Sequence, residues 1–310
     1  MSDVFVRRCA PLVFLLALGA CDPVPEEGQA GAGTPAPAAE SASKHVPRTR
    51  RAHDAPASFK RDRSGGVRDA GNFVVQYEET DNEDYQELEG IFQETRLLED
   101  TVAELNNVFF LPGDVPVVLR ECGEVNAFYD PEAQEISVCY ELIEYYAGMF
   151  LSEDQTEEEA AEGGEAVAGA TLFTFFHELG HALIDLYDLP VTGREEDAVD
   201  QLATMILLEG GDEGETAALN GAWSFLSEEE EDGEDSGEEL AFWDEHSLDE
   251  QRFYNIVCLI FGSNPDEYTY MVLDGDLPRP RAVRCKDEYK KNYAAWDRLL
   301  TPYMRVNNQR

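Results

Sequence analysis

The sequence predicts an α+β fold in which a small, mostly antiparallel sheet is followed by a helical C-terminal part. Short strand-like segments lie between residues 72 and 139, and a hairpin-type connection joins the last two of them. Beyond residue 142, apolar side chains recur mainly at helical spacing. Apolar residues make up 43% of the chain, which is enough to bury a core and excludes a fully disordered protein.

The sheet region begins with an expected strand at residues 72–77, of sequence NFVVQY. A long amphipathic helix is expected at residues 82–108, and the Pro-Gly pair at 112–113 ends the helical pattern. The remaining strands are expected at residues 115–120, 126–129 and 135–139. The sequence DPEAQ between the last two has the composition of a hairpin loop.

The C-terminal part is expected to contain helices at residues 142–151, 166–187, 195–209, 247–261 and 287–300. Two acidic, Gly-containing stretches interrupt them, at about residues 152–165 and 210–239, and both are expected to be loops. The acidic run at 228–232 has two interpretations, a weak calcium site or a solvated loop. The second is favoured, because the run lacks the spaced ligands and the turn Gly of a calcium loop.

The distribution of charge divides the chain into a leader and a domain. The formal net charge is −42, from 23 Lys and Arg against 65 Asp and Glu. Residues 1–68 hold 10 basic and 7 acidic side chains, whereas residues 69–310 hold 13 and 58. We therefore expect one folded, acidic domain at residues 69–310. Its charge argues against nucleic acid as a partner, because phosphate binding needs a basic patch.

Residues 1–21 have the pattern of a bacterial lipoprotein signal peptide. Two arginines precede an apolar run from Ala10 to Ala20, which is too short to span a bilayer as a stable helix. The run ends in Leu18-Gly19-Ala20-Cys21, which resembles a lipobox in which Cys21 is lipidated. A plain secretory signal with a chance Cys is the alternative. The prediction is an exported protein, anchored by lipid to the periplasmic or extracellular face of a bacterial membrane.

Residues 22–68 are rich in Pro, Ala, Gly and Ser and predict a linker without a fixed fold. The distal part of this linker is basic, which fits either contact with an anionic membrane surface or an ordinary soluble linker.

Four further cysteines lie in the domain, and an even number favours disulfides in an exported protein. We expect the local pairs Cys122–Cys139 and Cys258–Cys285, although four cysteines allow three pairings. A four-Cys zinc site is the alternative, and it is weakened because the chain has no CxxC spacing.

The motif that carries chemistry is His177-Glu178-Leu179-Gly180-His181, an HExxH sequence inside the helix expected at 166–187. Residues four apart share one helix face, so both imidazoles can bind one ion. Two imidazoles and a carboxylate suit Zn²⁺, and Glu178 can take a proton from a water in the open fourth position. The surrounding helix is apolar, and burial of these polar groups without a partner is costly. A hydrogen-bonded structural His pair is the alternative.

The third ligand is expected on the following helix. Glu196 and Asp200 are four residues apart and share a face, so Glu196 can bind the metal while Asp200 accepts a hydrogen bond from a ligand His. Glu195 is the competing ligand, because it also borders the apolar stripe of this helix. Acidic residues at this position also favour the helix dipole, with or without a metal.

The sequences HELGHALIDLYDLP and GREEDAVDQLA together resemble a bacterial family of metallopeptidases of unknown specificity, in the gluzincin group of zincins. Other blocks, such as NAFYDP, ISVCYEL and RCKDEY, extend the resemblance from about residue 73 to the C-terminus. The resemblance implies a zincin-like fold, with the HExxH helix and a Glu-bearing helix beside a small sheet. It implies peptidase chemistry, and therefore a peptide or protein as substrate, but it does not indicate which one. It also implies a zinc ligand set with a general base and a supporting acid, namely His177, His181 and Glu196 with Glu178 and Asp200.

A zincin also needs a donor for the oxyanion that forms during peptide hydrolysis. His246 is the candidate, with Tyr254 and Arg252 as alternatives, and a surface or structural role for His246 is the other interpretation. The strand expected at 126–129 is a candidate edge along which a peptide substrate adds. Two rival functions stay open. One is a zinc-binding protein without catalysis, and the other is an acidic interaction lipoprotein whose His pair is structural.

Overall fold

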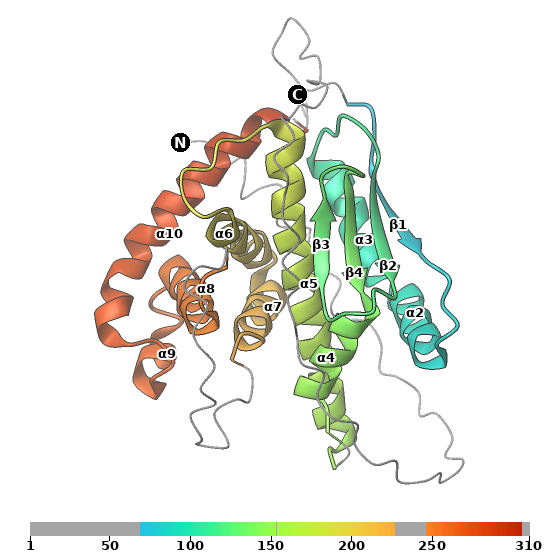
Figure 1. The fold of residues 1–310 in the computed structure, drawn as a ribbon. Helices are drawn as coiled ribbons and strands as arrows, with labels where there is room; N and C mark the ends of the chain where they lie inside the picture. Colours follow the sequence, from blue (N-terminus) through green and yellow to red (C-terminus); the bar gives the residue numbers. More distant parts are fainter. Residues whose placement is uncertain (1–68, 153, 227–245, 306–310) are drawn as a thin grey trace, which may run out of the picture. The chain divides into compact units, whose positions relative to one another are not determined.

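A computed structural model describes residues 69–152, 154–226 and 246–305 of the chain (Figure 1). The expected signal peptide with Cys21, the expected linker and the acidic run at 228–232 lie outside these residues.

The sheet has four strands, namely β1 (Phe73–Tyr77), β2 (Val115–Arg120), β3 (Ala127–Asp130) and β4 (Glu135–Cys139), in the order β1-β2-β4-β3. The strand positions are confirmed to within one residue, and β3 and β4 form the expected antiparallel hairpin. The expectation of a mostly antiparallel sheet is wrong, because β1–β2 and β2–β4 are parallel. The helices between β1 and β2 return the chain to the same end of the sheet, which is the geometry that parallel pairing requires.

The helix expected at 82–108 is two helices, α2 (Glu83–Thr95) and α3 (Leu97–Val108). Arg96 separates them in a left-handed backbone conformation, with φ of 55°. Its backbone N–H closes the last turn of α2 on the carbonyl of Phe92, and α3 starts at the next residue. Buried Leu98, Val102 and Leu105 lie on α3, which packs against β1.

The helical part consists of α4 (Tyr140–Phe150), α5 (Glu157–Tyr187), α6 (Glu195–Leu208), α7 (Gly211–Trp223), α8 (Asp249–Ser263), α9 (Thr269–Asp274) and α10 (Arg279–Leu300). Figure 1 shows α5 standing between the sheet and the other C-terminal helices. It packs against β3 and β4 on one side and against α6 and α7 on the other. By length and composition α5 could cross a membrane, but 78% of its most apolar stretch is buried inside the protein, as in a core helix.

Both expected acidic loops are wrong in part, because residues 157–165 belong to α5 and residues 211–223 form α7, while residues 227–239 lie outside the described part of the chain. The first acidic stretch contains the N-terminal end of α5, where the Thr156 hydroxyl accepts from the Glu159 N–H and the Glu159 carboxylate accepts from the Thr156 N–H. Three glutamates in the first turn favour the helix dipole, so acidity marks a helix start here. The second stretch contains α7, whose Ala217, Ala218 and Ala222 are buried.

Two helical segments differ from the prediction. The sequence does not predict α9, and α10 begins at Arg279 rather than near residue 287. Pro280 lies in the first turn of α10, where a missing N–H costs nothing.

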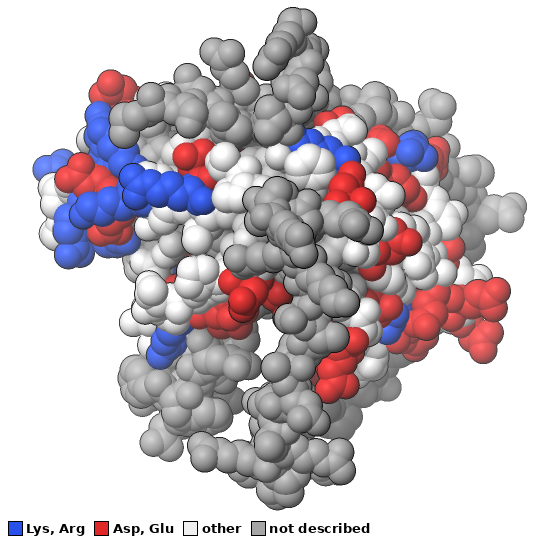
Figure 2. Space-filling view, turned by 90° about the horizontal axis from the view of Figure 1, so that it is seen from above, with Lys and Arg blue, Asp and Glu red and all other residues white. Residues whose placement is uncertain are grey.

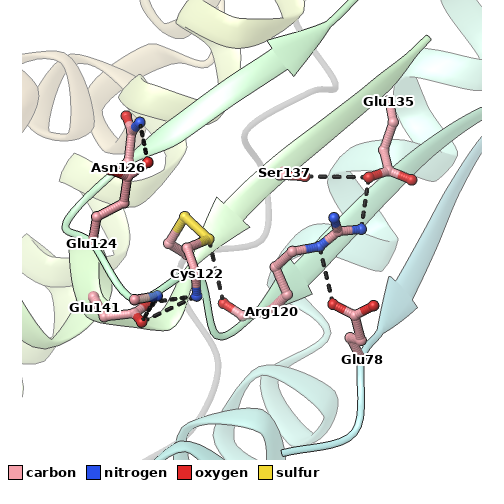
Figure 3. The surroundings of a disulfide bond; sticks show 10 residues. Glu78, Arg120, Cys122, Glu124, Asn126, Glu135, Ser137 and Glu141 are labelled. Carbon is pink, nitrogen blue, oxygen red and sulfur yellow. Dashed lines mark hydrogen bonds and ion pairs between the residues drawn. A yellow bond between two sulfur atoms is a disulfide. The ribbon is translucent and has the colours of Figure 1, made fainter. Parts of the chain in front are cut away.

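The disulfides Cys122–Cys139 and Cys258–Cys285 are both formed, which confirms the local pairs and contradicts the four-Cys zinc site. The first ties the loop before β3 to the end of β4 (Figure 3). The backbone N–H groups of Cys122 and Gly123 in this loop donate to the carboxylate of Glu141 on α4. The start of β3 is therefore held both covalently and by hydrogen bonds.

Candidate metal centre

The HELGH motif lies in the buried middle of α5. His177 and His181 are one turn apart, and their ring centroids are 5.0 Å from each other. Gly180 between them lets α6 approach closely, because a Cβ added there would lie 2.7 Å from the Cβ of Val199 on α6. The motif thus positions two imidazoles and also brings the next helix into contact with them.

Glu196, in the first turn of α6, reaches both imidazoles. One of its carboxylate oxygens lies 3.1 Å from His177 Nε2 and 3.4 Å from His181 Nε2. The ligand atoms of these three residues all lie within 4.8 Å of one another, a spacing suited to one metal ion. Glu195 instead contacts the second ring nitrogen of His181, with 2.9 Å between the Glu195 carboxylate and His181 Nδ1. The Glu195 side chain is 45% exposed.

Asp200, one turn further along α6, supports His177 from behind. Its carboxylate lies 2.7 Å from His177 Nδ1 and accepts two hydrogen bonds from Arg252 on α8, each 2.8 Å long. Burial alone would raise the pKa of Asp200, but Arg252 and His177 outweigh it and lower the pKa to about 2. The Arg252 guanidinium also lies over the ring of Phe225, 3.9 Å from its centroid.

Glu178 lies next to the His pair and is 7% exposed. Its carboxylate is 4.0 Å from His177 Nε2 and is hydrogen-bonded by the backbone of Tyr129. Burial raises the pKa of Glu178, and the two histidines only partly oppose this. A carboxylate whose pKa is raised towards neutrality is suited to proton transfer.

His246 approaches the same centre from the segment before α8. Its Nε2 lies 3.2 Å from the Glu196 carboxylate, and its carbonyl accepts a hydrogen bond from Arg194. Neither alternative named from the sequence, Arg252 or Tyr254, lines the cleft described next. Arg252 binds Asp200.

These groups open into a cleft of about 600 Å³ between β3, the C-terminal half of α5 and the start of α6. The strand predicted as a substrate edge is confirmed as an edge of the sheet, and it forms one wall of this cleft. Tyr129 on β3 donates its hydroxyl to Asp185, at 2.9 Å. Sequence reasoning missed this pair, although Asp185 lies four residues after His181 and so on the same helix face.

Residues 77–300 match the protein family described as "Putative metallopeptidase". The chain belongs to this metallopeptidase family. The match includes the whole His177, His181 and Glu196 group, and a metallopeptidase implies a bound metal. No curated protein and no solved structure matches the chain.

The residues of this family member fit a metal ion. Asp200 and Glu195 each hold the Nδ1 atom of one imidazole, which leaves both Nε2 atoms directed at the Glu196 carboxylate. Carboxylates that hold the outer nitrogen of ligand histidines are a common feature of metal sites, because they fix the ring orientation and the tautomer. Two imidazole nitrogens and one carboxylate oxygen form a donor set that suits zinc.

Proposed function

We propose that the protein is a zinc-dependent peptidase that hydrolyses peptide bonds with a metal-activated water. The observation that carries the proposal is the convergence of His177, His181 and Glu196 beside the buried Glu178 in an open cleft. Membership of a metallopeptidase family supports it. When bound, Zn²⁺ would polarise the substrate carbonyl and lower the pKa of a coordinated water.

Glu178 acts as the general base in this proposal. Its buried carboxylate lies 4.0 Å from His177 Nε2, and Glu178 lines the cleft. It takes a proton from the attacking water and delivers it to the departing amine nitrogen.

His246 is the proposed donor to the developing oxyanion. Of the three candidates named from the sequence, it is the one that lines the cleft. Its side chain is 45% exposed, so it can meet a substrate that enters from solvent. Arg194 holds its backbone, and the neighbouring Ser247 hydroxyl donates to Asp197 on α6, so the segment is tied to the metal centre.

The substrate is proposed to bind as an extended strand along β3. Among the described residues this strand pairs with β4 alone, and its other edge is the one proposed to accept a peptide backbone. An edge strand beside a motif-bearing helix is the arrangement expected of a zincin-like fold. Asp185, Asp188 and Glu195 also line the cleft, which favours peptides with Lys or Arg near the cleaved bond.

The proposal is tested with a mixed peptide library and metal analysis of the purified protein. Wild type is expected to bind one zinc and cleave the library, whereas Glu178→Gln keeps the zinc and loses cleavage by about 10²- to 10⁴-fold. His177→Ala is expected to lose the zinc. A wild type that binds zinc but cleaves nothing would identify a non-catalytic zinc protein, and a wild type without zinc would make the His pair structural.

We further propose that the protein is exported and lipid-anchored through Cys21. The two disulfides support export, because such bonds persist in oxidising compartments. Labelled fatty acid is expected to enter wild type but not Cys21→Ser. Equal labelling of both proteins, or of neither, would contradict the anchor.

A further inference from the structure

The outer face of α10 has a charge opposite to that of the rest of the domain. This helix holds seven of the 13 Lys and Arg in residues 69–310, against three acids. Six of the seven basic side chains are exposed, namely those of Arg279, Arg284, Lys286, Lys290, Lys291 and Arg298. The inner face packs on the core through Cys285, Trp296 and Leu300. Figure 2 shows these Lys and Arg side chains gathered on the α10 side of the molecule.

Ion pairs within α10 leave the charge of most of these exposed basic side chains unneutralised. Arg281, the half-buried basic residue, lies 2.7 Å from Glu288 and accounts for that acid. Arg284 is 3.9 Å from the same carboxylate and 66% exposed, a geometry worth little in water. Val283 lies among these residues and is 79% exposed, which makes it the most exposed large apolar side chain in the described part of the chain.

The shape and charge of this face fit a flat anionic surface. A helix of 22 residues is about 33 Å long, and its basic positions cover the solvent side along that length. At about 0.1 M salt the Debye length is about 10 Å, so a nearby surface senses α10 rather than the distant acidic side chains. The acidic remainder is repelled, which orients the molecule with α10 towards a negative surface.

The point where the leader joins the domain lies at one end of this helix. Asp69, the first described residue, is held by Arg305, which follows shortly after the end of α10. Arg305 also donates to the carbonyl of Phe109, so this junction is fixed to the folded core. An anchor at Cys21, as proposed above, would therefore attach the domain to the bilayer through a point close to one end of α10.

We propose that the basic face of α10, defined by Arg279, Arg284, Lys286, Lys290, Lys291 and Arg298, docks the domain on an anionic phospholipid bilayer. Val283 adds an apolar contact in the headgroup region. This surface is distinct from the cleft, and its role does not depend on peptidase activity.

The test uses the chain from Cys21 to Arg310, produced without acyl groups, in co-sedimentation with phosphatidylcholine vesicles with and without phosphatidylglycerol. Wild type is expected to bind the anionic vesicles at about 0.1 M salt and to be released at about 0.5 M. Two independent variants, K286Q/K290Q/K291Q and R279Q/R284Q/R298Q, are each expected to lower the partition coefficient about 100-fold. The matched control is K60Q/R61Q/R63Q, which removes three charges from the leader and should change binding much less.

Thermal unfolding of each variant checks that the helix is intact, and two separate triples keep the test valid if one of them misfolds. Equal binding to neutral and anionic vesicles would overturn the proposal, as would loss of binding in the leader variant alone. Binding to duplex DNA, or an α10-dependent dimer, without binding to anionic vesicles would assign the face to another partner.

Discussion

Two carboxylates of the α6 region, buried Asp200 on the helix and half-buried Glu209 just after it, behave in opposite ways. Asp200, in the second turn of α6, is held by Arg252 and His177, and its pKa is lowered to about 2 despite burial. Glu209 follows the last residue of α6, and burial raises its pKa to about 7. The partners, rather than the burial, decide whether a carboxylate on this helix is charged at neutral pH. The charged one is the one that supports the candidate metal centre.

The largest effect is expected from Asp200→Asn. The change leaves the buried Arg252 without its counter-charge, so we expect the free energy of unfolding to fall by about 3 kcal/mol. It also weakens the support of His177, so zinc affinity should fall roughly 10- to 100-fold. Urea unfolding of the zinc-free protein and competition with a chelator measure the two effects separately.

A conservative change at Arg252 is the control for that experiment. Arg252→Lys keeps the charge but loses the two-fold hydrogen bond, so its losses should lie between wild type and Asp200→Asn. If Asp200→Asn left both stability and zinc affinity unchanged, the contrast between Asp200 and Glu209 would have no functional meaning.

The next largest effect is expected from Glu209→Gln, and only above acidic pH. A raised carboxyl pKa means that Glu209 holds its proton more tightly in the folded state than in the unfolded state. The stability that this proton contributes is fully present below about pH 4.5 and is lost as pH rises through about 7. The variant stays neutral, so it should gain about 1 kcal/mol over wild type near pH 8, after allowance for solvent screening, and nothing near pH 4. Urea unfolding at both pH values tests this, with the exposed Glu250→Gln as control. A gain at both pH values would refute the assignment to ionisation.

The smallest effect is expected from Glu195→Gln. This residue contacts His181 as Asp200 contacts His177, but its side chain is 45% exposed and solvent can replace it. We expect a stability change within about 0.5 kcal/mol and a loss of zinc affinity below about tenfold. Chelator competition beside Asp200→Asn gives the comparison directly. A loss as large as that of Asp200→Asn would show that exposure does not distinguish the two supports.

The sequence predicted what depends on short-range spacing. A separation of four residues on a helix places His177 and His181 on one face whatever the fold, so this pair was predictable. Closely spaced cysteines pair because their loop is short, and both disulfides followed this rule. The pairing of β2 with β4 joins strands separated by a hairpin strand, and nothing local encodes it.

Other features depend on side-chain direction or on a single backbone angle. The choice between Glu195 and Glu196 is a difference of about 100° around the helix, which only the packing of α5 on α6 decides. Arg252 was a candidate oxyanion donor because its sequence position says nothing of the direction in which it points. The break between α2 and α3 lies at Arg96, with no Gly or Pro at that position. The apolar periodicity continues across it, so the sequence does not indicate where one helix ends and the next begins.

Gly180 has a consequence for the geometry of the candidate metal centre. It carries no ligand atom, yet its missing side chain sets how near α6 lies to α5, and therefore how far the Glu196 oxygen lies from the two imidazoles. The spacing of the three ligand groups therefore depends on a residue that supplies none of them. A methyl group at position 180 would meet Val199 and is expected to move α6 away from α5, which would separate the three donor groups without altering any of them.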